Sequence, residues 1–181
     1  MKAERWRFCL HESGHGLSAI VLGGRCLGLV IFDDGTGGLS QADELLGNRE
    51  AYSIAAGPAA EILASRFPVP EVAVIANCIN VDNLETSPLF ASSPMLACQM
   101  ARTPDTRKHF DSDDRALALW AIDGNESEPE RWASRVALAR RIASEIVERH
   151  ADAIVRVATA LFASGSLCRD EITELLKDKS E

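Results

Sequence analysis

The chain has 181 residues, which is enough for one hydrophobic core and too few for two domains of ordinary size. Its formal net charge of −8 argues against nucleic acid or an anionic membrane surface as a partner. The five cysteines are odd in number and include no C-x-x-C pair, which indicates free thiols in a reducing cytoplasm. No apolar run approaches the roughly 20 residues of a membrane span, so we expect a cytoplasmic protein.

The first predicted element is a helix over 5–22, which Gly23-Gly24 ends and which carries the sequence HESGH at 11–15. Residues four apart on a helix lie on one face, so His11 and His15 direct two imidazoles toward one point. Two neutral imidazoles make half of a tetrahedral Zn²⁺ site. Glu12 follows the first histidine, and its carboxylate can act as the general base toward a metal-bound water. The alternative interpretation is a packed helix with two half-buried histidines and a solvated glutamate.

The next predicted elements are a strand at 27–32, a turn at 33–38 and a returning strand at 39–41. The edge of the returning strand is suited to binding an extended peptide through its backbone. The candidate substrate-binding residues are Gly37, Gly38, Leu39 and Ser40. A second helix is predicted over 49–66, with Gly57-Pro58 expected to kink or split it.

Residues 67–110 are predicted to form an irregular excursion, either a flap over the site or ordinary packing. Acidic residues at 111–114 are typical of a helix start, and that helix should continue through Ile122 to Gly124-Asn125. Further helices are predicted over 130–150, from a break near Asp152 to about Phe162, and from about Asp170. We therefore expect a single domain over 1–181 of the mainly α (α+β) class. It would be bundle-like, with one small β-sheet or hairpin after the motif helix and with parts 1–66, 67–110 and 111–181.

Several stretches resemble the peptidase domain of the FtsH-type zinc proteases: HESGH on a helix, the glycine-containing strand pair, and AAGPAAEIL at 55–63. In that family HEAGH is followed by strands and by a helix reading like LGGRAAEEL. The tail at 148–176 is similar to the closing helices of the family. The resemblance implies a stand-alone, mainly helical Zn²⁺ peptidase domain. The resemblance does not extend to the ATPase module and membrane anchor of the family, so we do not expect ATP-driven unfolding of substrates to carry over.

The longer motif with a third histidine fails, because Ser18 and Val21 stand at its Gly and His positions. The resemblance implies an aspartate as third ligand, at the helix start Ser112-Asp113-Asp114. The face that follows Asp113 carries large apolar side chains at 117 and 120, which favours Asp113. An alignment with the family's SND stretch favours Asp114 instead, so both stay candidates.

Glu61 is predicted to lie behind the ligands and to hold a histidine N–H. In a gluzincin-like alternative, Glu61 or Glu50 would itself be the third ligand. The expected function is an ATP-independent zinc metalloendopeptidase acting on unfolded or extended polypeptide. The alternative is a zinc-binding regulatory or interaction module without turnover, against which the intact Glu12 argues. An oligomer or a separate ATPase partner is compatible with the sequence.

Overall fold

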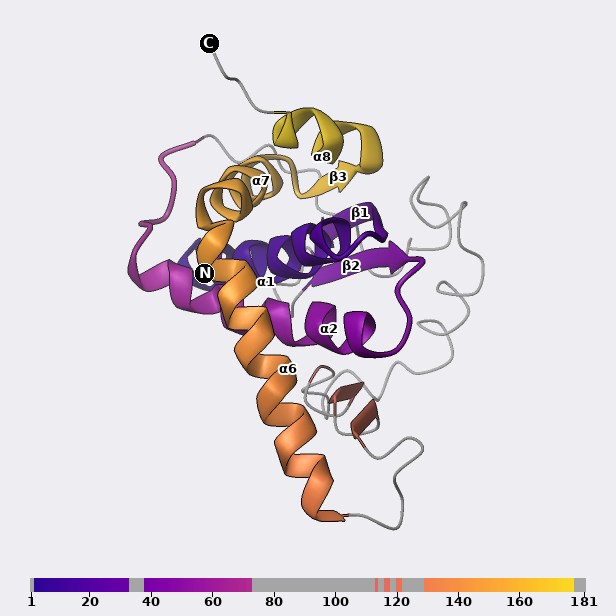
Figure 1. Ribbon diagram of the computed structural model, residues 1–181. Coiled ribbons are helices and arrows are strands. Elements are labelled where there is room, and N and C mark those ends of the chain that lie inside the picture. The colour runs from indigo at the N-terminus through magenta and orange to yellow at the C-terminus, as the bar shows by residue number, and fades with distance from the viewer. Residues whose placement is uncertain are drawn as a thin grey trace.

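The structure is a computed structural model that describes residues 2–32, 38–72 and 129–177, together with residues 113, 116, 117, 120 and 121. This part is mainly helical with one small antiparallel sheet, which confirms the predicted fold class. Figure 1 shows the elements in chain order: α1 (Lys2–Val21), β1 (Arg25–Ile31), β2 (Gly38–Asp43), α2 (Asn48–Ala60), the 3-10 helix η1 (Glu61–Ser65), α6 (Pro129–Arg149), α7 (Ala151–Ser164), β3 (Ser166–Cys168) and α8 (Arg169–Leu176). None of the helices in the described ranges is both long and apolar enough to cross a membrane.

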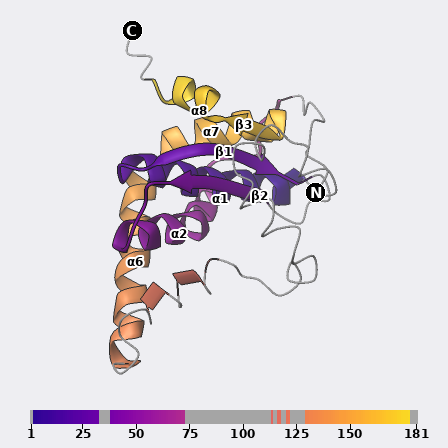
Figure 2. The same cartoon turned by 90° about the vertical axis from the view of Figure 1, so that its right-hand side faces the viewer.

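Helix α1 is the central element, because it packs against the sheet, α2 and α7 (Figures 1 and 2). Its apolar stripe is buried, with Trp6 2% and Leu10 0% exposed. Trp6 meets Phe162 of α7 edge to face, with 6.0 Å between the ring centroids. The indole N–H of Trp6 also donates to the carbonyl oxygen of Phe67 at 2.9 Å. The motif helix is therefore held from several sides and forms part of the core.

The contact between α1 and α2 is unusually close, because small residues face one another across it. A methyl group added at Gly14 would lie 2.6 Å from the carbonyl oxygen of Ala56 and 2.6 Å from Cβ of Ala60. Both alanines are fully buried. Contacts this short leave no room for a side chain at position 14, so the glycine is required by packing.

The sheet has the order β2-β1-β3, and both pairings are antiparallel (Figure 2). Leu29 in β1 pairs with Ser40 of β2 on one side and with Leu167 of β3 on the other. The predicted strand pair is present, but β3 was not predicted. The sheet therefore does not belong to 1–66 alone, since a strand from the C-terminal part completes it. Strand β2 lies at the edge of the described sheet.

The helix predicted over 49–66 is not split at Gly57-Pro58. Helix α2 continues through Pro58 to Ala60 and only then tightens into η1, which begins at Glu61. A proline inside a helix removes one backbone hydrogen bond and crowds the preceding turn. The Pro58 ring is exposed, so no neighbouring element has to make room for it.

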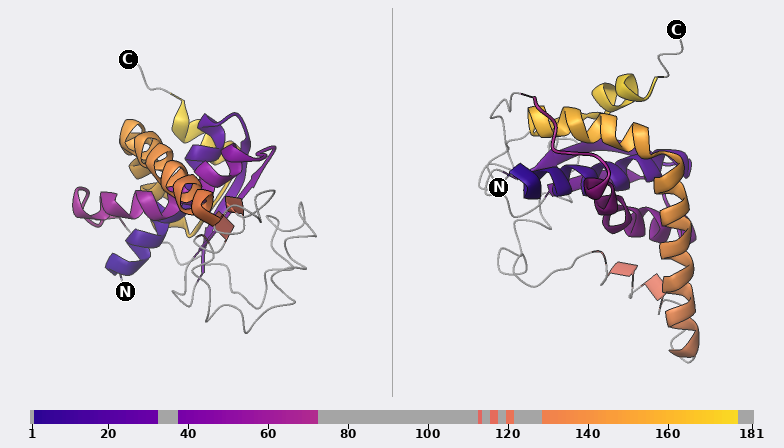
Figure 3. Two further views of the ribbon diagram at one scale, coloured as in Figure 1. Left: turned by 60° about the horizontal axis from the view of Figure 1, so that its bottom comes forward. Right: turned by 90° about the vertical axis from the view of Figure 1, so that its left-hand side faces the viewer.

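The C-terminal helices complete the core. The first turns of α6 project beyond the other elements, whereas Ala139, Ala143 and Val147 in its later turns are buried (Figures 1 and 3). The turn between α6 and α7 lies at His150, two residues before the break expected near Asp152. Helix α7 ends at Ser164 with Gly165 as its C-cap, two residues beyond the predicted end near Phe162. Apart from 67–72, the excursion predicted over 67–110 lies outside the described residues.

We expect Gly14→Ala to lower the free energy of unfolding by about 1–3 kcal/mol, because the added methyl group forces α1 and α2 apart. Ser13→Ala is the matched control on the same helix. The Ser13 hydroxyl is buried without a hydrogen-bond partner in the described part of the chain, so its removal should raise the free energy of unfolding by about 1 kcal/mol. Urea unfolding of both variants measures the two effects. A Gly14→Ala chain as stable as the wild type would contradict the packing argument.

Candidate metal centre

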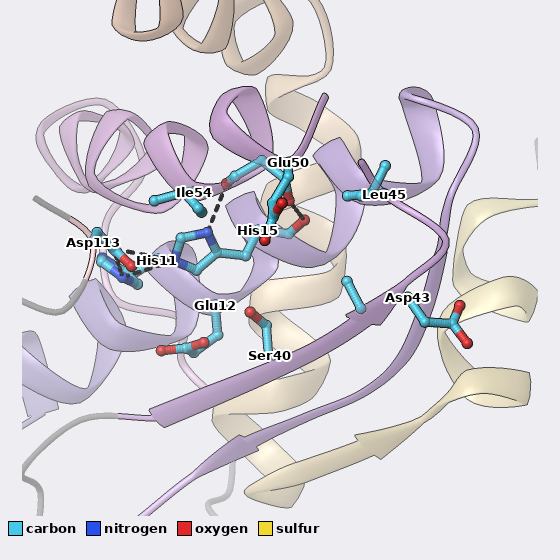
Figure 4. A pocket seen from close by; sticks show the side chains of 11 residues that line it. His11, Glu12, His15, Ser40, Asp43, Leu45, Glu50, Ile54 and Asp113 are labelled. Carbon is cyan, nitrogen blue, oxygen red and sulfur yellow. Dashed lines mark hydrogen bonds and ion pairs between the residues drawn. The ribbon is translucent and has the colours of Figure 1, made fainter. Parts of the chain in front are cut away.

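Three side chains converge at the middle of α1. The Nε2 atoms of His11 and His15 lie 3.1 Å apart. Oδ2 of Asp113 lies 3.0 Å from His11 Nε2 and 3.2 Å from His15 Nε2 (Figure 4). Asp113 is helical, and it shares a helix face with the buried residues Leu117 and Ala121. These three side chains form a group that could hold a metal ion.

The spacing of the three atoms fits a tetrahedral metal site. Ligand atoms at about 2.0–2.1 Å from a tetrahedral zinc ion are separated by about 3.3 Å. The three observed separations lie slightly below this value. The atoms thus occupy three corners of a tetrahedron of the required size.

The hydrogen bonds behind the two rings determine their tautomers. Nδ1 of His15 lies 2.8 Å from the carbonyl oxygen of Ser53, which can only accept, so this nitrogen carries the proton. Nδ1 of His11 donates in the same way to Oε1 of Glu61 at 2.8 Å. Both Nε2 lone pairs therefore point toward each other and toward the Asp113 carboxylate. Three acceptors without a donor between them require a positive charge at their centre.

The pKa values of His11 and Asp113 without a metal reflect the same need for positive charge between the three side chains. Burial lowers the pKa of His11, but hydrogen bonds to Asp113 and Glu61 outweigh burial and raise it to about 10. Burial opposes ionisation of Asp113, yet hydrogen bonds from the two histidines hold its pKa below the ordinary value. Protons thus supply the positive charge when no metal is bound. A divalent cation would have to displace them, so its affinity should rise with pH.

The position of the His15 ring depends on Gly57 in α2. A methyl group added at Gly57 would lie 2.3 Å from Nε2 and 2.5 Å from Cε1 of His15. The ring thus lies directly against the backbone of α2, where its Nδ1 reaches the Ser53 carbonyl in the preceding turn. The Ser53 and Ser18 hydroxyls both donate to the carbonyl oxygen of His15, at 3.2 and 2.9 Å. The Ser53 bond is a second hydrogen bond between α1 and α2 at this turn.

Glu12 lies beside the three converging side chains and is not one of them. Its side chain is on the β2 side of α1, next to Ser40 (Figure 4). Glu12 is only 6% exposed, and burial raises the pKa of its carboxyl group. The positive charges of His15 and His11 and a hydrogen bond with Ser40 act in the opposite direction. The Glu12 carboxylate therefore lies where it could transfer a proton, and the charges of its neighbours affect whether it is ionised.

A cavity of about 320 Å³ opens in front of these groups, between α1, β2 and α2. The residues that line it are His11, Glu12, His15, Ser40, Ala42, Asp43, Leu45, Glu50, Ser53, Ile54 and Asp113. Of the predicted substrate-binding residues, Ser40 lines this cavity and Gly38 and Leu39 lie on β2. Gly37 lies outside the described residues.

The acidic candidates for the third ligand take different places. Asp113 contacts both histidines, whereas Asp114 lies outside the described residues. Glu61 holds the His11 N–H, which is the place that the sequence analysis gave it. Glu50 is an exposed residue of the cavity wall. Sequence reasoning missed the part played by Gly57, because a Gly-Pro pair indicates a helix break and carries no sign of a ring packed against it.

No protein-family model and no curated protein matches this chain. The FtsH-type resemblance therefore stays a prediction, based on the motif and the order of the elements.

We predict that Asp113→Asn lowers Zn²⁺ affinity by more than the roughly 10–100-fold loss that is usual for partners behind the ligands. The amide keeps the shape of the side chain and removes the negative charge. Asp43→Asn changes another carboxylate on the wall of the same cavity and should leave the affinity nearly unchanged. Competition with a chromophoric chelator gives both values. A larger loss in Asp114→Asn than in Asp113→Asn would transfer the ligand role to Asp114.

Gly57→Ala should also weaken Zn²⁺ binding, because the methyl group occupies the space of the His15 ring. We expect a loss of at least about tenfold, comparable to losing the partner that orients a ligating histidine. Pro58→Ala, at the neighbouring exposed position, controls for changes in helix propensity. Unchanged Zn²⁺ affinity in a folded Gly57→Ala chain would show that His15 does not need this contact.

Proposed function

We propose that the chain is a zinc metallopeptidase that hydrolyses peptide bonds of unfolded or extended polypeptides without ATP. The observation that carries the proposal is the convergence of His11, His15 and Asp113 in one cavity, with the buried Glu12 beside them. This arrangement agrees with the chemistry that the HESGH motif predicts. The proposed peptidase domain would be similar to those of the FtsH-type proteases, and the free thiols of Cys9, Cys26 and Cys168 suit the cytoplasm.

The donor set supports zinc as the metal. Two imidazole nitrogens and one carboxylate oxygen suit Zn²⁺, whereas Mg²⁺ and Ca²⁺ prefer oxygen ligands throughout. Structural zinc sites usually have four protein ligands, while catalytic sites have three and an open position. Among the described residues three candidate ligands lie at the wall of a cavity, and this supports the catalytic type.

When bound, the zinc ion would act as a Lewis acid that activates water and polarises the carbonyl of the scissile peptide bond. Glu12 takes the proton of the attacking water, and it later passes this proton to the nitrogen of the leaving amine. Ser40 lies next to the Glu12 carboxylate and favours its ionised form by lowering its pKa. The N–H groups at Nδ1 of the two histidines stay engaged with Ser53 and Glu61, so they take no part in proton transfer.

The place of β2 suggests how a substrate binds. Within the described residues, strand β2 pairs with β1 on one side and has no partner on the other, and its residues Ser40, Ala42 and Asp43 line the cavity. An extended peptide could add to this edge through backbone hydrogen bonds, which give affinity with little sequence preference. The cavity lies between this edge and α2, so such a peptide would pass in front of the ligands (Figure 4).

The gluzincin-like alternative is less well supported, because Glu61 already accepts a hydrogen bond from His11 Nδ1 on the side of the ring remote from Nε2. A zinc-binding module without turnover is the main rival. Such a module would have no use for a buried carboxylate beside the ligands, since burial of an ionisable group costs free energy.

Glu12→Gln separates the enzyme from the binding module. The variant should keep its zinc and its fold, because Glu12 is not one of the ligands. It should cleave an unfolded polypeptide at least ~10²-fold more slowly than the wild type, the usual scale for a positioned general base. Zinc content and the rate at which an unfolded polypeptide such as casein is cleaved are measured on the same samples. His11→Ala is the metal-free reference. A fully zinc-loaded wild type that cleaves no unfolded chain would favour the binding module.

A further inference from the structure

Arg7 lies one helical turn before His11 on α1, and both side chains meet the carboxylate of Glu61. Arg7 Nε donates to Glu61 Oε2 at 3.2 Å, and Arg7 Nη2 donates to the same oxygen. His11 Nδ1 donates to the other oxygen, Oε1, at 2.8 Å. Each carboxylate oxygen therefore has its own partner, and together the partners fix the plane of the carboxylate.

Arg7, Glu61 and His11 form a chain of contacts that runs from the surface to the candidate metal centre. The side chain of Arg7 is 58% exposed, that of Glu61 26% and that of His11 19%. Glu61 is the first residue of η1, the point at which α2 tightens from an α-helix into a 3-10 helix. The ordinary interpretation of Arg7 is a surface ion pair, which contributes little to stability. The chain offers such a pair for comparison, Arg66 with Glu148, at an N–O distance of 2.6 Å.

We propose that Arg7 is a positioning residue of the metal centre. It holds the Glu61 carboxylate in the orientation that keeps the proton of His11 on Nδ1 and directs the Nε2 lone pair at the metal. The inference rests on the metal site of the proposed function and is independent of peptide hydrolysis.

The sign of the effect distinguishes positioning from simple charge. If Arg7 acted only through its field, its removal would relieve repulsion of a cation and strengthen Zn²⁺ binding. Positioning predicts the opposite, because an unrestrained Glu61 holds His11 less well. Direct partners of ligating histidines typically change metal affinity 10–100-fold. Arg7 is one step farther out, so we expect a loss of about 3–10-fold.

The test measures Zn²⁺ affinity by chelator competition on the full chain, without any peptide. Arg7→Met should bind Zn²⁺ about 3–10-fold more weakly than the wild type. Arg7→Lys should recover part of the loss, because an ammonium group can still reach one carboxylate oxygen. Arg66→Met removes an exposed arginine of the same kind of pair and should change nothing. Visible spectra of the Co²⁺-loaded chains should shift in Arg7→Met and stay unchanged in Arg66→Met.

A double-mutant cycle with Glu61→Gln shows whether Arg7 acts through Glu61. Arg7→Met should cause no further loss of affinity in the Glu61→Gln chain. An equal loss in both backgrounds, or an affinity in Arg7→Met that is unchanged or higher, would overturn the inference. A wild type that binds Zn²⁺ and shows these effects, yet cleaves no polypeptide, would refute the peptidase function and leave the inference intact. A wild type without Zn²⁺ affinity would overturn both.

Discussion

The metal centre depends on the short distance between α1 and α2. Gly14 lets the backbone of α1 reach that of α2, and Gly57 lets the His15 ring fill the remaining space. The same approach brings His15 Nδ1 to the Ser53 carbonyl. Helical spacing alone would put two imidazoles on one face, but their rings could still rotate. Packing against α2 removes that freedom at His15, so ligand geometry is a consequence of how two core helices meet.

Much of this site follows from local patterns in the sequence, and the rest depends on tertiary contacts. The i, i+4 spacing of His11 and His15 and the apolar face behind Asp113 are local, and the structure brings these three residues together. The close approach at Gly57 is not local, because it depends on which ring lies opposite. Strand β3 is three residues long and too short for an alternating pattern, and it forms because β1 offers it a partner. Glu61 could be placed near a histidine, but the choice of His11 depends on where η1 begins.

The two histidines are held in different ways, and this difference has chemical consequences. His15 is buried, and its partner is a backbone carbonyl that cannot move without α2. His11 is partly exposed, and its partner is a carboxylate whose pKa is lowered by the His11 hydrogen bond and by Arg7. A carboxylate partner makes an imidazole a stronger electron donor than a carbonyl partner does. The ring of His15 is therefore held in a fixed position by the backbone. The electron-donor strength of His11, by contrast, depends on Glu61 and so can be altered by substitutions outside the three candidate ligands.

Glu12, the proposed general base, and the three candidate ligands form one electrostatic unit. Burial raises the pKa of Glu12 and so favours its protonated form, and a protonated carboxyl group cannot accept a proton from water. Positive charge on His15 and His11 favours its ionised form, but this charge exists only while the imidazoles carry extra protons. A divalent cation between the same three ligands would supply positive charge without those protons, at pH values where the imidazoles must be neutral to bind it. In the proposed mechanism, a bound metal that activates water would thus also favour the ionised form of Glu12, so loss of the ion would remove the Lewis acid and weaken the base together.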